Sequence, residues 1–162
     1  MPRWEAEGTP DFKQVIPYVI LEHQPTGRIF MTARLGGDER LLGQNSIGLG
    51  GHIDEDESIM DCLYRELKEE VALDREDIAD IAFCGFLYSD ANEVDSVHVG
   101  MVYRVFCTRE DLICQEKDKL TGSWFTPKEL REARNSGHME SWSVMAYDAL
   151  LHEDDEADEE EG

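Results

Sequence analysis

The chain has 162 residues, of which 41% are hydrophobic and 32% are charged, and its formal net charge is −22. This length is that of one domain, and the composition is typical of a folded globular protein. No apolar run reaches the roughly 20 residues that cross a membrane, and the first residues lack the apolar core of a signal peptide. We therefore expect a cytoplasmic protein without a membrane partner. The acidic surface repels phosphate backbones, which argues against a binder of nucleic acid duplexes.

The acidic residues are concentrated toward the C-terminal end. Eight of the 37 lie within residues 153–161, a segment without apolar periodicity. We predict an N-terminal extension over residues 1–11, a single domain over 12–152 and a disordered acidic tail over 153–162. Without the eight tail acids, 29 acidic residues still outnumber 15 basic ones. An anionic substrate would therefore need bound cations or a local cluster of arginines and lysines.

The first third of the chain predicts strands. Residues 13–21 are rich in β-branched and aromatic side chains, and a Pro-Thr-Gly turn separates them from residues 28–34, their expected hairpin partner. The glycine-punctuated stretch that follows predicts a loop. Residues 46–53 then predict a short strand that contains a pair of glycines and runs into an acidic segment.

The second half predicts two long strands and two helices. The strand patterns cover residues 79–90 and 98–108, and the polar segment between them predicts a hairpin-type connection. Thr126, Pro127 and Glu129 mark a helix start, with a capping threonine, a proline at the first helical position and a glutamate three residues after the cap. A last helix is predicted over residues 139–151. We expect its packed face to consist of Trp142, Met145, Ala146 and Leu150.

Between these halves lies GGHIDEDESIMDCLYRELKEEVAL, residues 50–73. Apolar residues recur there at every fourth position and predict an amphipathic helix that either Asp56 or Ser58 caps. The predicted buried stripe is Ile59, Leu63, Leu67 and Val71.

One edge of this helix gathers three carboxylates. Glu69 and Glu70 lie three and four residues after Glu66, and Arg65 is placed to hold a carboxylate. An ordinary solvated helix whose Arg and Lys balance its Glu remains an alternative. The glycines at positions 50 and 51 favour a site, because they let backbone carbonyls approach a ligand, and Mg²⁺ prefers oxygen ligands of this kind.

The segment resembles the Nudix box, which reads Gly, five residues, Glu, seven residues, Arg-Glu-apolar-x-Glu-Glu-x-Gly-apolar. The residues in register are Gly51, Glu57, Arg65, Glu66, Leu67, Glu69, Glu70 and Leu73. The second glycine is replaced by Ala72. In the family this glycine ends the helix in a left-handed conformation that is costly for alanine, so we expect a helix exit of a different shape.

The resemblance implies an α/β fold, a Nudix-type α/β/α sandwich with a mixed β-sheet and a catalytic loop-helix-loop. It implies a metal-dependent pyrophosphohydrolase that cleaves a phosphoanhydride of a nucleoside diphosphate linked to another group. The implied cofactor is Mg²⁺ or Mn²⁺, and the implied partner is a small-molecule nucleotide diphosphate derivative. A homodimer is compatible with the resemblance.

By position, the resemblance also implies residue roles. Glu66, Glu69, Glu70 and the Gly50 carbonyl would bind the metal. Arg65 would orient a carboxylate, and Glu57 would brace the loop against the helix. The general base varies in the family, and the candidates outside the box are Glu93, Glu116 and Asp118. Candidate substrate contacts are Arg34, Arg40, Gln44 and Tyr88.

Two alternatives share the implied fold. One is a non-catalytic Nudix-fold domain that senses a nucleotide, although such domains usually lose box glutamates. The other is an isoprenoid-diphosphate isomerase, which needs a reactive cysteine. Cys62 lies in the apolar part of the helix and is poorly placed for that chemistry.

Overall fold

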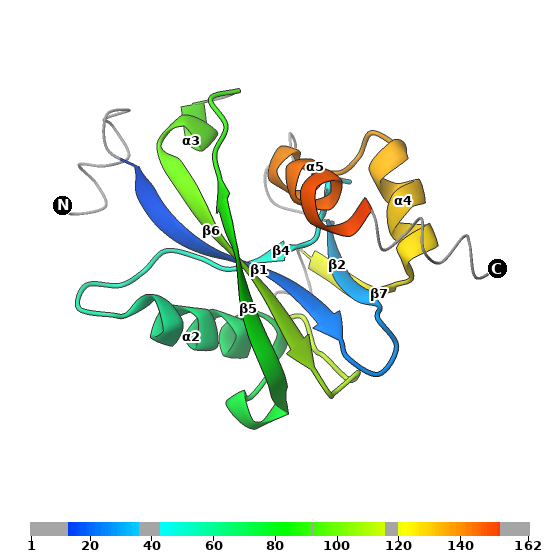
Figure 1. Cartoon of the computed structure of the whole chain (residues 1–162), viewed down its shortest axis with the longest axis horizontal. Coiled ribbons are helices and arrows are strands. Elements are labelled where there is room, and N and C mark those ends of the chain that lie inside the picture. Colours follow the sequence, from blue (N-terminus) through cyan, green and yellow to red (C-terminus); the bar gives the residue numbers. More distant parts are fainter. Residues whose placement is uncertain (1–12, 36–42, 92, 116–119, 153–162) are drawn as a thin grey trace.

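The computed structural model describes residues 13–35, 43–91, 93–115 and 120–152. In these ranges a mixed sheet lies between helices on its two faces (Figure 1). The strands are β1 (Gln14–His23), β2 (Ile29–Arg34), β3 (Asn45–Ser46), β4 (Gly48–Leu49), β5 (Ile78–Leu87), β6 (His98–Cys107) and β7 (Leu120–Phe125). The helices are α2 (Ile59–Val71), α3 (Glu93–Ser96), α4 (Pro127–Asn135) and α5 (Ser141–Ala146), with a 3₁₀ turn η2 (Arg75–Asp77) and a π-helical turn η3 (Tyr147–Leu151). The predicted N-terminal extension and acidic tail lie outside the described residues.

The sheet combines parallel and antiparallel pairs. The strand order is β3-β2-β1-β6-β5, with β4 also paired to β1 and β7 to β2. β1 and β6 run parallel, whereas the other pairs are antiparallel, including the predicted hairpin of β1 and β2. The two long strands predicted in the second half are β5 and β6, and the short α3 occupies their connection.

The two faces of β1 support separate apolar cores. Val19 and Leu21 face α2, whereas Tyr18 and Ile20 belong to the cluster under α4 and α5. This alternation follows from the period of two of a strand, and it makes β1 the central strand of an α/β/α sandwich. The predicted fold class is confirmed.

Local signals predict the start of α4 well. The Thr126 hydroxyl accepts from the Glu129 amide and the Glu129 carboxylate accepts from the Thr126 amide, which completes the predicted capping box. The predicted strand over residues 46–53 is shorter than expected, because β4 ends at Leu49 and an irregular loop follows. None of the described helices is long and apolar enough to span a membrane.

The packed face of the last helix differs from the prediction. Trp142 and Ala146 are buried, but Met145 is 36% exposed. The helix continues from α5 into the π-helical η3, and the wider turn shifts the periodicity. Tyr147 and Leu151 complete the buried side of this helix.

Candidate functional site

The helix α2 is positioned by one cap and one buried stripe. Ser58, not Asp56, is the cap, and its hydroxyl accepts a 3.1 Å hydrogen bond from the Asp61 amide. Leu63, Leu67 and Val71 are buried as predicted. Ile59 is only partly buried, and it packs against the same core. With this stripe against the sheet, the charged edge of the helix faces the preceding loop.

The glycine pair lets that loop approach the sheet and the helix closely. Gly50 has φ +148°, and a Cβ atom on it would lie 2.0 Å from the Pro17 carbonyl oxygen. A Cβ atom on Gly51 would lie 2.4 Å from Glu66 Oε1. The Glu70 carboxylate accepts a 2.9 Å hydrogen bond from the Gly50 amide. The two box glutamates therefore lie against the glycine peptides, and side chains at these positions would displace them.

Arg65 joins the acidic residues of the loop and of the helix. Its guanidinium donates to both carboxylate oxygens of Glu57 at 2.8 Å. Its Nη1 lies 2.9 Å from Glu66 Oε1 and 3.2 Å from Glu69 Oε2. Its Nη2 donates to the His52 carbonyl at 3.0 Å. The structure thus brings the Arg65 guanidinium into contact with three of the predicted acids.

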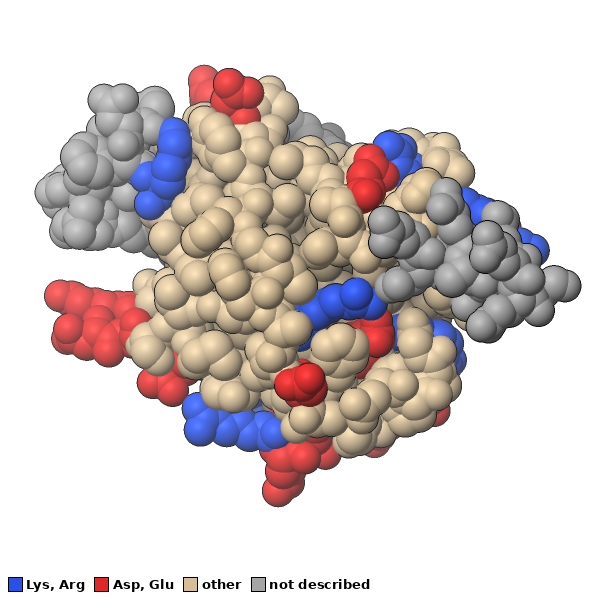
Figure 2. All heavy atoms as spheres, viewed as in Figure 1, with Lys and Arg blue, Asp and Glu red and all other residues tan. Residues whose placement is uncertain are grey.

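The residues around Arg65 carry more negative charge than its guanidinium balances. Hydrogen bonds from Arg65 lower the pKa of Glu57 to about 2. Burial raises the pKa of Glu66 above its ordinary value, even though Arg65 lies beside it. Figure 2 shows acidic side chains at the edge where Figure 1 places the loop before α2, and Asp54, Glu55 and Asp56 are exposed in this loop. One guanidinium does not balance this charge, so the site suits a cation.

The oxygen donors fit a hard divalent cation. Glu66 and Glu70 lie against the Gly50–Gly51 backbone, and the Glu66 side chain is only 13% exposed. Glu69 is turned toward Arg65 and its side chain is 59% exposed. Over the described ranges, no three His, Cys, Asp or Glu side chains already converge as a metal cluster. The chemistry of the donors fits Mg²⁺ or Mn²⁺, with two carboxylates at the glycine peptides and the third beside them.

The expectation of a different helix exit is wrong. Ala72 takes the left-handed conformation, with φ 57° and ψ 35°, that a glycine adopts readily. Its amide bonds to the Lys68 carbonyl at 3.1 Å, and Arg109 donates to its carbonyl at 2.6 Å. Contacts from elsewhere in the chain therefore hold an alanine in a conformation that its side chain disfavours.

Two of the predicted substrate contacts line one polar pocket. It is lined by Thr32, Arg34, Gln44, Asn45, Ser46, Leu120 and Glu140. Tyr88 is elsewhere, 45% exposed just after β5, with Lys13 Nζ 5.1 Å from its ring centroid. Glu93 is exposed at the start of α3. Arg40, Glu116 and Asp118 lie outside the described residues.

Sequence reasoning missed the wall of this pocket that α5 provides. The Tyr18 hydroxyl donates to Glu140 Oε1 at 2.8 Å and lies 2.7 Å from Ser143 Oγ. The Tyr18 ring occupies the space that a side chain on Gly48 would fill, 2.0 Å from its Cβ position. Burial, and next the Glu140 charge, raise the pKa of Tyr18 well above its ordinary value. Glu140 is 122 residues from Tyr18, so no local pattern reveals the contact.

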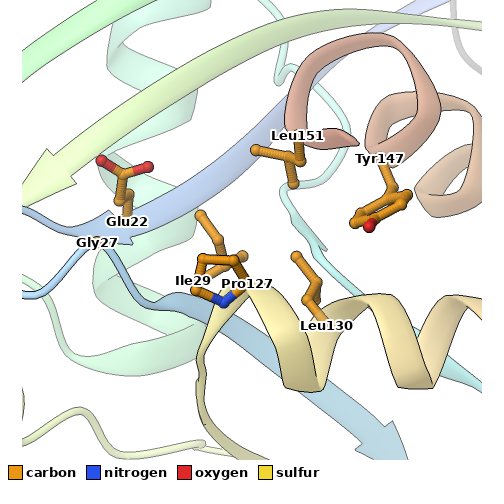
Figure 3. Close-up of a pocket in the computed structure, with 7 residues that line it drawn as sticks. All are labelled: Glu22, Gly27, Ile29, Pro127, Leu130, Tyr147 and Leu151. Atoms are coloured by element: carbon orange, nitrogen blue, oxygen red, sulfur yellow. The ribbon is translucent and has the colours of Figure 1, made fainter. Parts of the chain in front are cut away.

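A second, smaller pocket lies on the α4 side of the sheet (Figure 3). Its lining is Glu22, Gly27, Ile29, Pro127, Leu130, Tyr147 and Leu151. The Glu22 carboxylate is paired with Arg104 at 2.7 Å. No box residue contributes to it, so it is separate from the site on α2.

The structure weakens the isomerase alternative. Cys62 is fully buried, and burial raises the pKa of its thiol to about 12. A nucleophilic or acid-base cysteine needs an accessible thiol whose pKa lies near the working pH. Cys62 instead packs in α2.

Comparisons with known proteins agree with this geometry. The model of the NUDIX domain matches residues 14–159. Protein YmaB of Bacillus subtilis (strain 168) is 33% identical over 160 residues, which cover 93% of this chain and 77% of that protein. The crystal structure of Tm1382, to which a Nudix hydrolase function is ascribed, superposes with a TM-score of 0.75 and 29% identity, covering 94% of this chain and 78% of that one. The dihydroneopterin triphosphate pyrophosphohydrolase of E. coli shares the fold, with a TM-score of 0.63, 16% identity and coverage of 88% and 99%.

Proposed function

Since the chain belongs to the NUDIX family, we propose that it is a metal-dependent pyrophosphohydrolase. Its substrate would be a nucleoside diphosphate linked to another group, and water would attack the phosphoanhydride. The observation that carries this proposal is the contact of Arg65 with Glu57, Glu66 and Glu69, beside a Glu70 that bonds to Gly50. The acidic residues of the box are all present, whereas a non-catalytic nucleotide sensor does not need them.

Four groups would hold Mg²⁺ or Mn²⁺, namely the Glu66, Glu69 and Glu70 carboxylates and the Gly50 carbonyl. Held there, the ion would neutralise the diphosphate and lower the pKa of an attacking water. Burial disfavours the charged form of Glu66, so a nearby cation would stabilise this carboxylate. Arg65 keeps Glu66 and Glu69 oriented, and Glu57 fixes Arg65 in turn through two hydrogen bonds.

The general base has two kinds of candidate. The Glu69 side chain is 59% exposed, and it contacts Arg65 at 3.2 Å. It is therefore accessible to a water molecule. Acids of later loops are the other kind, and of these Glu93 is exposed in α3. Glu93→Gln tests the second kind, because loss of the base lowers kcat more than KM, whereas Glu69→Gln would also remove a proposed metal ligand.

The polar pocket would receive the part of the substrate beyond the diphosphate. Ser46 lines this pocket and is four residues before Gly50, so extended chain between them spans at most about 14 Å. Arg34 supplies a cation, Gln44 supplies an amide, and Glu140 accepts hydrogen bonds from sugar hydroxyls or base amino groups. The pocket thus offers both signs of charge close to the glycine peptides.

The test is product formation from a panel of nucleoside diphosphate derivatives with Mg²⁺ or Mn²⁺, resolved by chromatography. Glu70→Gln should lower turnover about 10²-fold or more, because it removes a metal ligand and little core volume. Glu76→Gln is the matched control, since Glu76 is an exposed acid in η2 outside the box. Binding across the panel without metal-dependent cleavage would favour the nucleotide sensor instead.

Cytoplasmic location and a homodimer stay predictions. Two exposed aromatic side chains on the edge strand β5, Phe83 and Phe86, lie in contact with ring centroids 5.5 Å apart. Sedimentation of the wild type against Phe86→Ser would test whether this edge takes part in self-association.

A further inference from the structure

The end of α2 lacks the glycine with which the helix of a Nudix box ends, and Ala72 stands in its place. Ala72 is left-handed, a conformation that L-residues with a Cβ atom avoid. The last carbonyls of a helix also have no partners within the helix. Both problems fall at the end of the helix that carries Glu69 and Glu70, so contacts from outside the helix are needed there.

One segment, residues 109–115, provides that support. Arg109 Nη2 donates to the Ala72 carbonyl at 2.6 Å. The Ile113 amide donates to the Val71 carbonyl at 3.2 Å, and the Gln115 amide donates to the Glu70 carbonyl at 3.0 Å. Three consecutive carbonyls at the helix end are therefore bonded by a segment that begins 37 residues later in the chain.

This segment is itself anchored to the sheet. Arg109 follows β6 by two residues, and its Nη1 donates to Asp77 Oδ2 at 3.0 Å. The Trp124 indole of β7 donates to the Glu110 carbonyl at 2.8 Å. The Thr108 amide donates to the Asp77 carbonyl at 3.0 Å. Residues 109–115 are thus bonded to the strands and to the turn after α2. They therefore fix the helix end relative to the sheet.

We infer that Arg109 is a positioning residue for Glu70, and that it holds Ala72 in the left-handed conformation that the box glycine would adopt without strain. This inference rests on the proposed function, in which Glu70 is a metal ligand. Arg109 has no part in the chemistry itself. It keeps Ala72 left-handed through the carbonyl contact, and the fixed exit keeps the last turn of α2, and with it the Glu70 carboxylate, against the Gly50 amide.

The test is a double-mutant cycle of Arg109→Met and Ala72→Gly. Methionine keeps the apolar stem but donates no hydrogen bond, and glycine takes the left-handed conformation without help. Arg109→Met should lower kcat about tenfold or more with little change in KM, since small displacements of a catalytic group are costly. Ala72→Gly in the same chain should restore kcat to within about twofold of the wild type, because the exit then needs no external donor.

Arg134→Met is the matched control. Arg134 pairs with Asp148 through two 3.0 Å hydrogen bonds on the opposite side of the sheet. It should cost some stability and leave kcat unchanged. A fall in kcat on Arg109→Met that Ala72→Gly does not rescue would overturn the inference, and so would an unchanged kcat at equal folded fraction.

Amide hydrogen exchange on the metal-free protein separates this inference from the proposed function. Arg109→Met should speed exchange at Ala72 and Leu73, whose amides bond to carbonyls of α2, and Ala72→Gly should restore protection. A protein that hydrolyses nothing but shows this pattern would refute the proposed hydrolase and leave the support of the helix end standing. Unchanged exchange in Arg109→Met would refute the support itself.

Discussion

The helices on the two faces of the sheet differ in how closely they follow the usual preferences for helix capping, charge spacing and backbone conformation. On the α4 and α5 face, Thr126 completes a capping box and the Glu140 side chain caps α5. On the α2 face, like charges are crowded and the two non-glycine residues with positive φ in the described chain, Asp56 and Ala72, flank the helix. Departures of this kind persist when surrounding contacts enforce them, and they concentrate at functional sites. The contrast itself therefore points to the α2 face as the site.

The largest effects should come from matched core truncations on the two faces. Leu67 and Leu130 are each 1% exposed, Leu67 under α2 and Leu130 under α4. We expect Leu67→Ala and Leu130→Ala each to lower the free energy of unfolding by about 2–5 kcal/mol, measured by urea denaturation. Only Leu67→Ala should also lower kcat at equal folded fraction, because Leu67 lies between Glu66 and Glu69. An equal loss of kcat in Leu130→Ala would show that the faces are not separable.

The sequence predicts features that neighbours in the chain determine. The start of α4 follows from Thr126, Pro127 and Glu129, which act on one another within one turn. The buried stripe of α2 follows from its period, and the box residues follow from a pattern of fixed spacing. These features need no knowledge of the rest of the chain, so a single sequence is sufficient for them.

Features that depend on contacts between distant segments were not predicted from the sequence. The left-handed Ala72 depends on Arg109, and the wall of the polar pocket depends on Glu140 meeting Tyr18. Met145 was also assigned to the packed face, whereas the buried residues of α5 are Trp142, Ser143 and Ala146. In the first two cases the deciding partner lies far away in the chain and leaves no periodic trace in the sequence.

A smaller effect is expected at the cap of α4. Thr126→Ala removes the acceptor of the Glu129 amide, and it should lower the free energy of unfolding by about 1 kcal/mol. The hydrolysis rate should stay unchanged, because the cap lies on the face without the box. Thermal denaturation followed by circular dichroism gives the stability. A change in kcat larger than the change in folded fraction would contradict the division between the faces.

Unlike the variants above, Ala72→Gly in the otherwise unchanged chain should stabilise the protein. Relief of the left-handed alanine should outweigh the greater freedom of glycine in the unfolded chain and raise the free energy of unfolding by about 0.5–1 kcal/mol. Urea denaturation measures the gain. Gly137 has φ +82°, so Gly137→Ala is the control that introduces the strain which Ala72→Gly removes. A loss of stability in Ala72→Gly would mean that the alanine methyl group makes contacts worth more than the strain.

The smallest effect is expected in acid, at the loop before α2. The pKa of Glu57 is about 2 in the folded protein, whereas an unfolded glutamate has a pKa of about 4.3. Between these values the unfolded chain binds the proton more readily, so the stabilising contact with Arg65 is complete above about pH 4.3 and is lost as the pH falls toward 2. Glu57→Gln should therefore flatten the decline of the free energy of unfolding over this window, measured without added metal. Asp148 on the other face, whose pKa Arg134 lowers, offers the comparison through Asp148→Asn. If only Asp148→Asn flattened the curve, the Glu57 carboxylate would not bind Arg65 in solution, and the loop would lack the brace on which the proposed metal site depends.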